Sequence, residues 1–342
     1  MVKIHVLIAS LLMANYFVLH QAIISPQNLT TDLSALLEFK SHISLDPFGS
    51  LDNWSSTTFV CNWTGISCAF KNQRVTALNL SNWSLRGIIP PHLGNLTFLT
   101  SLDFSHNNFS GFIPHQLANL RSLKLMNVGY NNLCGEIPSW FGNLQELQFL
   151  LLNNNSFSGV IPLSVGNISK LKQLNLGCNL LEGNIPKRIG NLSNLRTLTL
   201  RGNQLTGSIP SGIFNISLEE IDFAENSLSG SLPLDICNHQ LKQIKGLNLS
   251  VNQLQGSIPS KLYNCRDLEH LSLSYNQFNG QIPRTLGYLV KLKDLSLGGN
   301  IFTGVNSIST PNLCSYLSAV RKFANSVFVH LQSYSSHTKL YC

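Results

Sequence analysis

The sequence predicts an elongated α/β solenoid of about ten stacked units, preceded by a helical N-terminal cap. The first observation behind this prediction is repetition: a Gly-x-Ile-Pro or Gly-x-Leu-Pro phrase recurs with 24, 24, 24, 24, 24, 23, 26 and 24 residues between its glycines, and Gly304 follows after another 24 without its proline. The second is that each glycine ends the same leucine-containing phrase. Such periods are typical of architectures in which each unit contacts only its neighbours. The glycines are Gly87, Gly111, Gly135, Gly159, Gly183, Gly207, Gly230, Gly256, Gly280 and Gly304.

The composition limits the classes of protein that fit. Only 11% of the 342 residues are charged, and 43% are hydrophobic. These fractions exclude a coiled coil and a charged disordered chain, and they supply enough apolar residues for a long core. The 23 basic and 16 acidic residues give a net charge of +7. Because no block of basic residues occurs, this charge does not indicate a nucleic-acid partner.

Residues 1–24 are expected to be a secretory signal peptide. Lys3 precedes the apolar run Ile4–Met13, which has the length of a signal-peptide hydrophobic region. The alternative is a membrane anchor, but polar residues interrupt the roughly 20 apolar residues that a spanning helix needs. These polar residues are His5, Asn15, His20 and Gln21. We therefore expect a secreted or extracellular chain without a spanning segment.

If the chain is secreted, some of its asparagines can be glycosylated. Twelve Asn-x-Ser/Thr sequences occur, and in a secreted chain each is a candidate glycosylation site. They are Asn28, Asn53, Asn62, Asn79, Asn82, Asn95, Asn108, Asn154, Asn167, Asn191, Asn215 and Asn248. On the register of the repeat, we expect Asn79, Asn82 and Asn248 on the inner sheet. The outer face is expected to carry Asn95, Asn167, Asn191 and Asn215.

Residues 25–74 are expected to form the N-terminal cap. An amphipathic helix is predicted over residues 29–43, with Thr30-Thr31-Asp32 as its start signal. Cys61 and Cys68 lie close together in the chain, which predicts a local disulfide in an oxidising compartment. A zinc site is the alternative, but no Cys-x-x-Cys or paired-histidine spacing supports one.

Residues 75–304 are expected to hold the ten repeats. A representative phrase is Leu195-x-x-Leu198-x-Leu200-x-x-Asn203-x-Leu205-x-Gly207. Leucines that alternate with polar residues have the period of two that is typical of a half-buried strand. Stacking ten such strands at about 4.8 Å predicts an inner sheet roughly 43 Å long. The phrases begin at Val75, Leu99, Leu123, Leu147, Leu171, Leu195, Leu218, Ile244, Leu268 and Leu292.

The other positions of the phrase have separate roles. The asparagine is polar at a core-facing turn, so its amide is expected to bind backbone groups of adjacent turns. Trp83 replaces it in the first phrase, where one neighbouring unit is missing. The glycine relieves the turn, and Ile-Pro enforces an extended segment on the far side. A second apolar set, such as Ile189, Leu192 and Leu195, returns the chain to the next strand.

Residues 305–342 are expected to be a divergent tail. They contain no Leu-x-x-Leu-x-Leu phrase and no clear second cap, although Cys314 and Cys342 are candidates for pairing. An uncovered last repeat would be a liability, because a solenoid needs a polar surface at each end.

The cysteines inside the repeats leave two interpretations open. Cys237 and Cys265 lie on the outer side of adjacent repeats and form either a disulfide or, at Cys265, a buried thiol in an apolar position. Cys134 and Cys178 belong to non-adjacent repeats, so they are expected to be unpaired.

The candidate binding surface is the solvent-facing side of the inner sheet. Leu125, Phe149 and Leu151, with Tyr130 beside them, are expected to make an exposed apolar patch in repeats three and four. The alternative is that these are ordinary surface apolar residues. Charged residues follow in repeats six and seven, where they either contact a ligand or neutralise each other in solvent. They are Arg196, Arg201, Glu220 and Asp222, with Glu219, Glu225 and Lys245 nearby.

The Leu-x-x-Leu-x-Leu-x-x-Asn-x-Leu-x-Gly-x-Ile-Pro phrase resembles the plant-specific class of leucine-rich repeats. The leader DLSALLEFKSHISLDPFGSLDNWSS…CNWTGISC resembles the N-terminal cap of plant leucine-rich-repeat receptor-like kinases. The likeness covers residues 25 to 304. It implies a cell-surface ectodomain that binds a peptide, protein or glycan ligand and pairs with a co-receptor that has its own leucine-rich-repeat ectodomain.

Other motifs of that family do not occur in the sequence. Only 38 residues follow Gly304, and no glycine-rich phosphate loop or His-Arg-Asp catalytic phrase is found, so we expect no enzyme, cofactor or metal site in this chain. The sequence favours a truncated receptor-type ectodomain in defence or developmental signalling. The alternatives are a secreted inhibitor similar to the polygalacturonase-inhibiting proteins and a non-functional truncated product.

Overall fold

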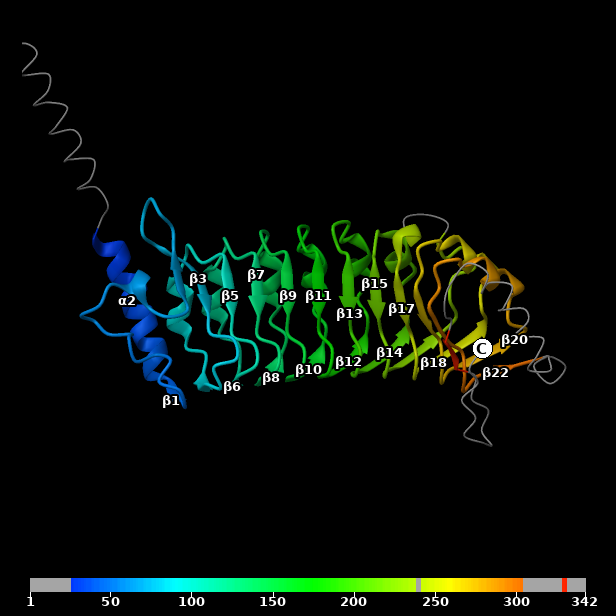
Figure 1. Ribbon diagram of the computed structural model, residues 1–342, viewed down its shortest axis with the longest axis horizontal. Coiled ribbons are helices and arrows are strands. Elements are labelled where there is room, and N and C mark those ends of the chain that lie inside the picture. The colour runs from blue at the N-terminus through cyan, green and yellow to red at the C-terminus, as the bar shows by residue number, and fades with distance from the viewer. Residues whose placement is uncertain (1–25, 238–240, 304–327, 331–342) are drawn as a thin grey trace, which may run out of the picture.

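The computed structural model describes residues 26–237, 241–303 and 328–330. In this part of the chain the repeats stack in order into one elongated solenoid, with the helical cap at one end (Figure 1). Residues 1–24, predicted to be a signal peptide, lie outside the described residues, as do Cys314 and Cys342. No helix in the described ranges is long and apolar enough to cross a bilayer.

The inner sheet contains one strand from each of the ten predicted phrases. These strands pair in parallel with their neighbours and in exact register, for example Leu174 with Leu198 between β11 and β13. The antiparallel strand β2 (Ile66–Cys68) from the cap pairs with β3 and begins the sheet. The repeat strands are β3 (Val75–Asn79), β5 (Ser101–Asp103), β7 (Leu125–Asn127), β9 (Phe149–Leu151), β11 (Gln173–Asn175), β13 (Thr197–Thr199), β15 (Glu220–Asp222), β17 (Gly246–Asn248), β19 (His270–Ser272) and β21 (Asp294–Ser296).

A second parallel sheet is formed by the segments that lead up to or contain the glycine of each repeat, whereas the sequence predicted an extended segment only on the far side of the glycine. Most of these glycines have a left-handed backbone, such as φ +73° at Gly207, which a side chain would strain. Strand β1 (Ile43–Leu45) joins this sheet antiparallel to β4. Its other strands are β4 (Arg86–Ile88), β6 (Asn108–Gly111), β8 (Asn132–Glu136), β10 (Ser156–Val160), β12 (Leu180–Asn184), β14 (Gln204–Ser208), β16 (Ser227–Gly230), β18 (Gln253–Ser257), β20 (Gln277–Gly280) and β22 (Ile301–Phe302).

Short 3-10 helices complete most repeats on the convex side. Each of them except η8 starts directly after the proline of Ile-Pro or Leu-Pro, whose fixed φ suits an extended residue ahead of a helical turn. They are η2 (Pro91–Asn95), η3 (His115–Asn119), η4 (Ser139–Asn143), η5 (Leu163–Asn167), η6 (Lys187–Asn191), η7 (Ser211–Asn215), η8 (Leu241–Gln243), η9 (Ser260–Asn264) and η10 (Arg284–Tyr288), and η1 (Val60–Asn62) lies in the cap.

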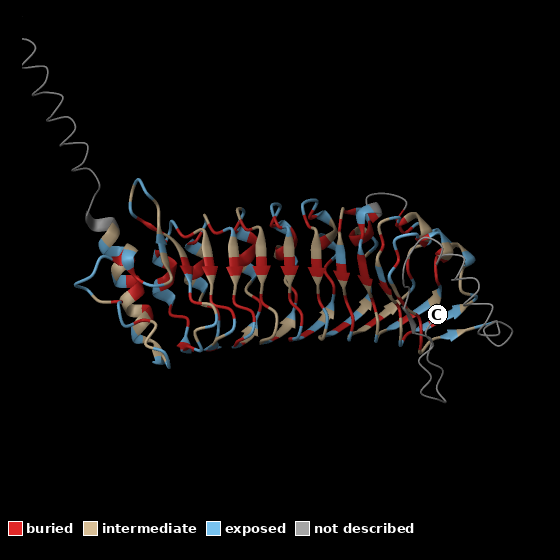
Figure 2. Ribbon diagram, in the orientation of Figure 1, coloured by how far each residue is buried: buried red, intermediate tan, exposed pale blue. Residues whose placement is uncertain are grey.

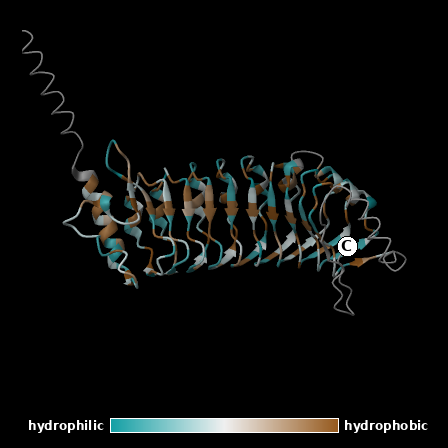
Figure 3. Cartoon of the chain, in the orientation of Figure 1, coloured by the Kyte–Doolittle hydropathy of each residue, from teal (hydrophilic) through white to brown (hydrophobic). Residues whose placement is uncertain are grey.

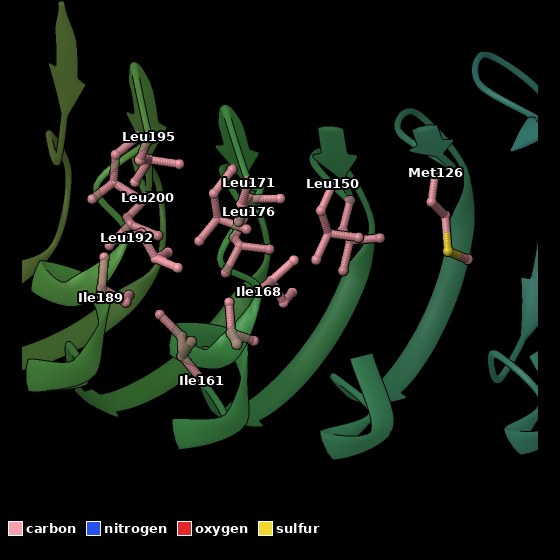
Figure 4. Packing of buried hydrophobic residues seen from close by; sticks show 14 of the residues in the cluster. Met126, Leu150, Ile161, Ile168, Leu171, Leu176, Ile189, Leu192, Leu195 and Leu200 are labelled. Atoms are coloured by element: carbon pink, nitrogen blue, oxygen red, sulfur yellow. The ribbon is translucent and has the colours of Figure 1, made fainter. Parts of the chain in front are cut away.

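The core is one continuous apolar cluster that runs through all the repeats. Buried residues occupy the same place on successive inner strands and form a band across the sheet (Figure 2), which coincides with the hydrophobic band of Figure 3. Ile189, Leu192 and Leu195 are almost fully buried, so the second apolar set does return the chain to the next strand. Figure 4 shows the same stacking for Leu171 and Leu176 against Leu195 and Leu200.

The repeated asparagine binds backbone groups of neighbouring turns, as predicted. The Nδ2 of Asn179 donates to the carbonyl oxygens of Leu152 (3.1 Å) and Leu176 (3.0 Å), and its Oδ1 accepts a hydrogen bond from the amide of Phe157 (3.0 Å). Asn179 is only 7% exposed. One side chain therefore connects two adjacent repeats and satisfies backbone groups that would otherwise be buried without partners.

The cap helix α2 (Pro26–Ser41) begins before the predicted start, so Thr30-Thr31-Asp32 lies within it and does not cap it. Asp32 is instead fully buried and accepts hydrogen bonds from Nε and Nη2 of Arg74, both at 2.8 Å, and from the amide of Val75. This ion pair fastens the cap to β3. The predicted Cys61–Cys68 disulfide is present.

Two other features settle or correct the sequence interpretation. Cys237 and Cys265 form a disulfide between adjacent repeats, whereas Cys134 and Cys178 are unpaired. In the segment expected to be a divergent tail, β23 (Phe328–His330) pairs in parallel with β21. The missing leucine phrase does not exclude such a strand, because backbone pairing requires only an extended segment in register.

Candidate functional site

The solvent-facing side of the inner sheet is the candidate binding surface. Most of its repeat strands have three residues, of which the middle one is buried and the two flanking ones face solvent. Because side chains alternate along a strand, each strand contributes two positions to this face. In-register pairing then aligns these positions in columns along the solenoid.

The predicted apolar residues do meet on this face. Leu125 on β7 is in register with Phe149 on β9, and Leu151 of β9 is in register with Asn127. All three apolar side chains are half-buried. We call Leu125, Phe149 and Leu151 the apolar patch.

Tyr130 stacks on another aromatic ring. It lies in the turn after β7 with a left-handed backbone (φ +56°), and its side chain is 48% exposed. Its ring stacks on that of His106, with 4.1 Å between the centroids. The two rings form a small platform at the edge of the sheet. Aligning the strand positions of the repeats could not reveal this contact, because both residues lie in turns.

The charged residues of repeats six and seven divide into two groups. Arg201 forms an ion pair with Glu225 (2.5 Å), and this hydrogen bond raises the pKa of Arg201. Glu219 pairs with Lys245 at 2.8 Å. For these residues the interpretation as mutual neutralisation is confirmed. Arg196 instead donates from Nη1 to the backbone carbonyl oxygens of Ser193 (3.2 Å) and Leu195 (3.1 Å).

Glu220 and Asp222 lie two residues apart on the same face of β15. Among the described residues neither carboxylate has an ion-pair partner within 4 Å. Burial raises the pKa of both groups, although His270 opposes this shift at Glu220 and the amide of Ala224 opposes it at Asp222. Asp222 is half-buried and Glu220 is more exposed, and the charges of Arg201 near Asp222 and Lys245 near Glu220 only partly offset the effect of burial on their pKa values.

Glu220 and Asp222 also line a hollow of about 330 Å³ that the sequence interpretation missed. It extends from β15, in repeat seven where binding was expected, over β17, β19 and β21 in the three repeats that follow. A signal was present in the sequence. The residue just before the second leucine of each repeat phrase has a side chain in the other repeats, but in repeat eight it is Gly246. The lining residues are Glu220, Ile221, Asp222, Gly246, Leu247, Asn248, His270, Leu271, Ser272, Asp294 and Ser296.

The candidate glycosylation sites occupy both faces. Asn79 is exposed on β3, and Asn248 is half-buried on β17, where it lines the hollow. The convex sites end 3-10 helices and are exposed; they are Asn95, Asn167, Asn191 and Asn215. Asn28 lies in α2, and its side chain is outside the described part. Within the described ranges, no group of three or more His, Cys, Asp or Glu residues is arranged to hold a metal ion.

Two family models match the chain. The leucine rich repeat N-terminal domain matches residues 29–69. The leucine rich repeat model matches residues 74–96, 98–120, 122–144, 146–168, 170–192, 194–216, 217–239 and 267–289. The second model alone covers more than half of the 342 residues.

Curated relatives from Arabidopsis thaliana match a shorter segment. A probable LRR receptor-like serine/threonine-protein kinase is 48% identical over 71 residues, and the LRR receptor-like serine/threonine-protein kinase EFR is 44% identical over 70 residues. These segments span about a fifth of this chain and 7% of each relative.

Solved structures cover more of the fold. The ectodomain of the plant receptor kinase GASSHO1/SCHENGEN3 from Arabidopsis thaliana, in complex with CASPARIAN STRIP INTEGRITY FACTOR 2, has a TM-score of 0.73 at 38% identity, over 78% of this chain and 32% of that one. The Arabidopsis receptor kinase HAESA, in complex with the peptide hormone IDA and the co-receptor SERK1, has a TM-score of 0.73 at 33% identity, over 80% and 46%. A plant ice-binding protein has a TM-score of 0.73 at 29% identity, over 80% and 88%.

Proposed function

The chain belongs to the leucine-rich-repeat family, and from this premise we propose that it is a receptor-type ectodomain whose inner sheet binds an extracellular peptide or protein ligand. The observation that carries the proposal is the apolar patch on the solvent-facing side of β7 and β9. Half-exposed clustered apolar side chains are typical anchors of an interface. The likeness to ectodomains solved with peptide hormones supports a ligand of this class.

The proposal extends to the setting in which binding occurs. We place the chain outside the cell, in defence or developmental signalling, with a second leucine-rich-repeat ectodomain as co-receptor. Support comes from the HAESA complex, which contains both a peptide hormone and a co-receptor. No catalytic step is assigned to the residues of the inner face.

A peptide-display selection against the purified chain tests this proposal. Selected peptides are titrated against the wild type, the double variant Phe149→Ala and Leu151→Ala, and the control variant Phe112→Ala, which removes a 70% exposed phenylalanine following β6 of the second sheet. We expect at least tenfold weaker binding by the double variant, because each buried aromatic or aliphatic anchor contributes about 1–3 kcal/mol.

Unchanged affinity in the double variant, with loss only in the control, would remove the apolar patch as the binding site. A separate assay measures inhibition of a purified polygalacturonase. Strong inhibition there, without any selected peptide ligand, would replace the receptor-type proposal with the inhibitor function.

A further inference from the structure

The hollow on the inner face of β15, β17, β19 and β21 is lined mainly by acidic and polar groups. Its floor consists of in-register positions: Glu220 pairs with Gly246, Gly246 with His270, and His270 with Asp294. The next column adds Asp222, Asn248, Ser272 and Ser296. Carboxylate, amide and hydroxyl groups therefore surround a volume of about 330 Å³.

Gly246 lets the carboxylate of Glu220 lie over β17. A Cβ at this position would collide with Oε2 of Glu220, because the carboxylate occupies the space that a side chain would take. Any side chain at position 246 would therefore displace the Glu220 carboxylate. The glycine thus makes room for a carboxylate in the middle of the sheet.

The charges around the hollow do not cancel. The nearby basic residues each pair with another acid: Lys245 with Glu219, Lys293 with Glu269 and Arg201 with Glu225. His270 contacts Asp294 through Nδ1. Within the described part of the chain, this leaves the carboxylates of Glu220 and Asp222 without an ion-pair partner. The desolvation that raises the pKa of both groups is therefore a cost that a bound cation would offset.

We propose that this hollow binds the arginine side chain of an extended peptide that lies across the inner sheet. The assignment rests on the proposed function, since it names the chemistry of one part of the ligand. Charge complementarity selects a cation, and the planar guanidinium donates five hydrogen bonds in a fixed fork. Glu220 and Asp222, on one face of β15, accept from one edge of that fork, and Asn248 on β17 and Ser272 on β19 offer further acceptors.

The probes are two pentapeptides, acetyl-Gly-Gly-Arg-Gly-Gly-amide and its citrulline analogue, which has the same shape without the charge. Ligand-observed NMR at low salt measures their binding to the full chain. The chain carries Ser250→Ala, which removes the glycan acceptor sequence at Asn248 inside the hollow. We expect the arginine peptide to bind at least fivefold more tightly than the citrulline peptide.

Two variants test the location. Glu220→Gln keeps the shape and removes one charge, and Gly246→Ala displaces the Glu220 carboxylate without changing the charge; each is expected to weaken binding of the arginine peptide at least fivefold. The matched control is Glu146→Gln, a half-buried carboxylate that pairs with Lys170 at 2.6 Å. It should bind like the parent chain. Equal binding of both peptides, or parental affinity in Glu220→Gln, would overturn the inference.

The pentapeptides contain no apolar anchor, so their binding is independent of the apolar patch. The double variant Phe149→Ala and Leu151→Ala must bind the arginine peptide normally. If the arginine peptide does not bind while a selected ligand still depends on the apolar patch, the inference about the hollow is wrong and the proposed function stands. If the arginine peptide binds while selected ligands ignore the apolar patch, the proposed binding site falls instead.

Discussion

Val251 occupies a left-handed backbone conformation (φ +55°) that its branched side chain disfavours. The conformation is fixed by the repeat, because the amide of Val251 donates to Ser274 and its carbonyl oxygen accepts from Asn226. Equivalent turns elsewhere use glycine or a residue that is not β-branched, such as Gly202, Asn154 and Tyr130. Among the described residues, Val251 is the one β-branched side chain that the repeat holds in this conformation.

Replacing Val251 with asparagine should relieve that strain. Asparagine visits the left-handed region readily, so we expect Val251→Asn to raise the free energy of unfolding by about 0.5–1 kcal/mol. Equilibrium urea unfolding measures the change. The control Val160→Asn alters another exposed valine, on β10, that has no left-handed backbone, and it should give no gain. Equal effects at both positions would show that strain is not the cause.

The carboxyl groups of the hollow predict a pH dependence. Burial raises the pKa of Asp222 above its ordinary value of 3.8. A raised pKa means that the folded state binds a proton at this carboxyl group more tightly than the unfolded state does. The resulting contribution to the free energy of unfolding is fully present at acid pH, and it is lost as the pH rises through the raised pKa. Asp222→Asn removes this loss and keeps an acceptor for the amide of Ala224, which lies 3.2 Å away.

We therefore expect Asp222→Asn and the wild type to melt at similar temperatures near about pH 3, and the variant to melt at a higher temperature near about pH 7. Differential scanning calorimetry across this range checks the prediction. A difference in Tm that does not change with pH, or a lower Tm of the variant at neutral pH, would contradict it.

At the scale of the element, the repeated asparagines at the turn after each inner strand connect each repeat to the next, and we call them the asparagine ladder. Asn179→Ala removes three donated hydrogen bonds and the acceptor for Phe157, and it leaves buried backbone groups without partners. We expect a loss of about 2–4 kcal/mol in the free energy of unfolding, measured by urea denaturation. Asn194→Ala, at an exposed asparagine with one hydrogen bond to Ser169, should cost less than about 1 kcal/mol. Similar costs at both sites would refute the role of the ladder.

How much of each element the sequence predicts depends on the kind of interaction that forms it. The inner strands and the ladder follow from side-chain period, so Leu198, Asn203 and their equivalents mark them directly. The second sheet and β23 depend on backbone pairing, which has no side-chain signature. The role of Asp32 was missed for a related reason, because its partner Arg74 is 42 residues away and α2 begins at Pro26.

At the scale of the whole molecule, the inner sheet carries two chemically different regions along its length. The apolar patch lies on β7 and β9, and the hollow with Glu220 and Asp222 lies from β15 onward. Three strand intervals separate β9 from β15, or about 14 Å at the usual spacing. An extended peptide of four or five residues spans that distance. The column alignment found the patch, whereas the depth of the hollow required the coordinates, because it depends on the lean of Glu220 over Gly246.

The most direct measurement of the central claim is hydrogen–deuterium exchange of the full chain with and without a peptide from the display selection. A ligand on the inner face should slow exchange in peptides that contain β7 to β15, and leave the second sheet (β8 to β16) and the convex helices η3 to η7 unchanged. Slower exchange confined to the second sheet or the convex helices, with no change on the inner strands, would contradict the assignment of the inner sheet as the binding surface.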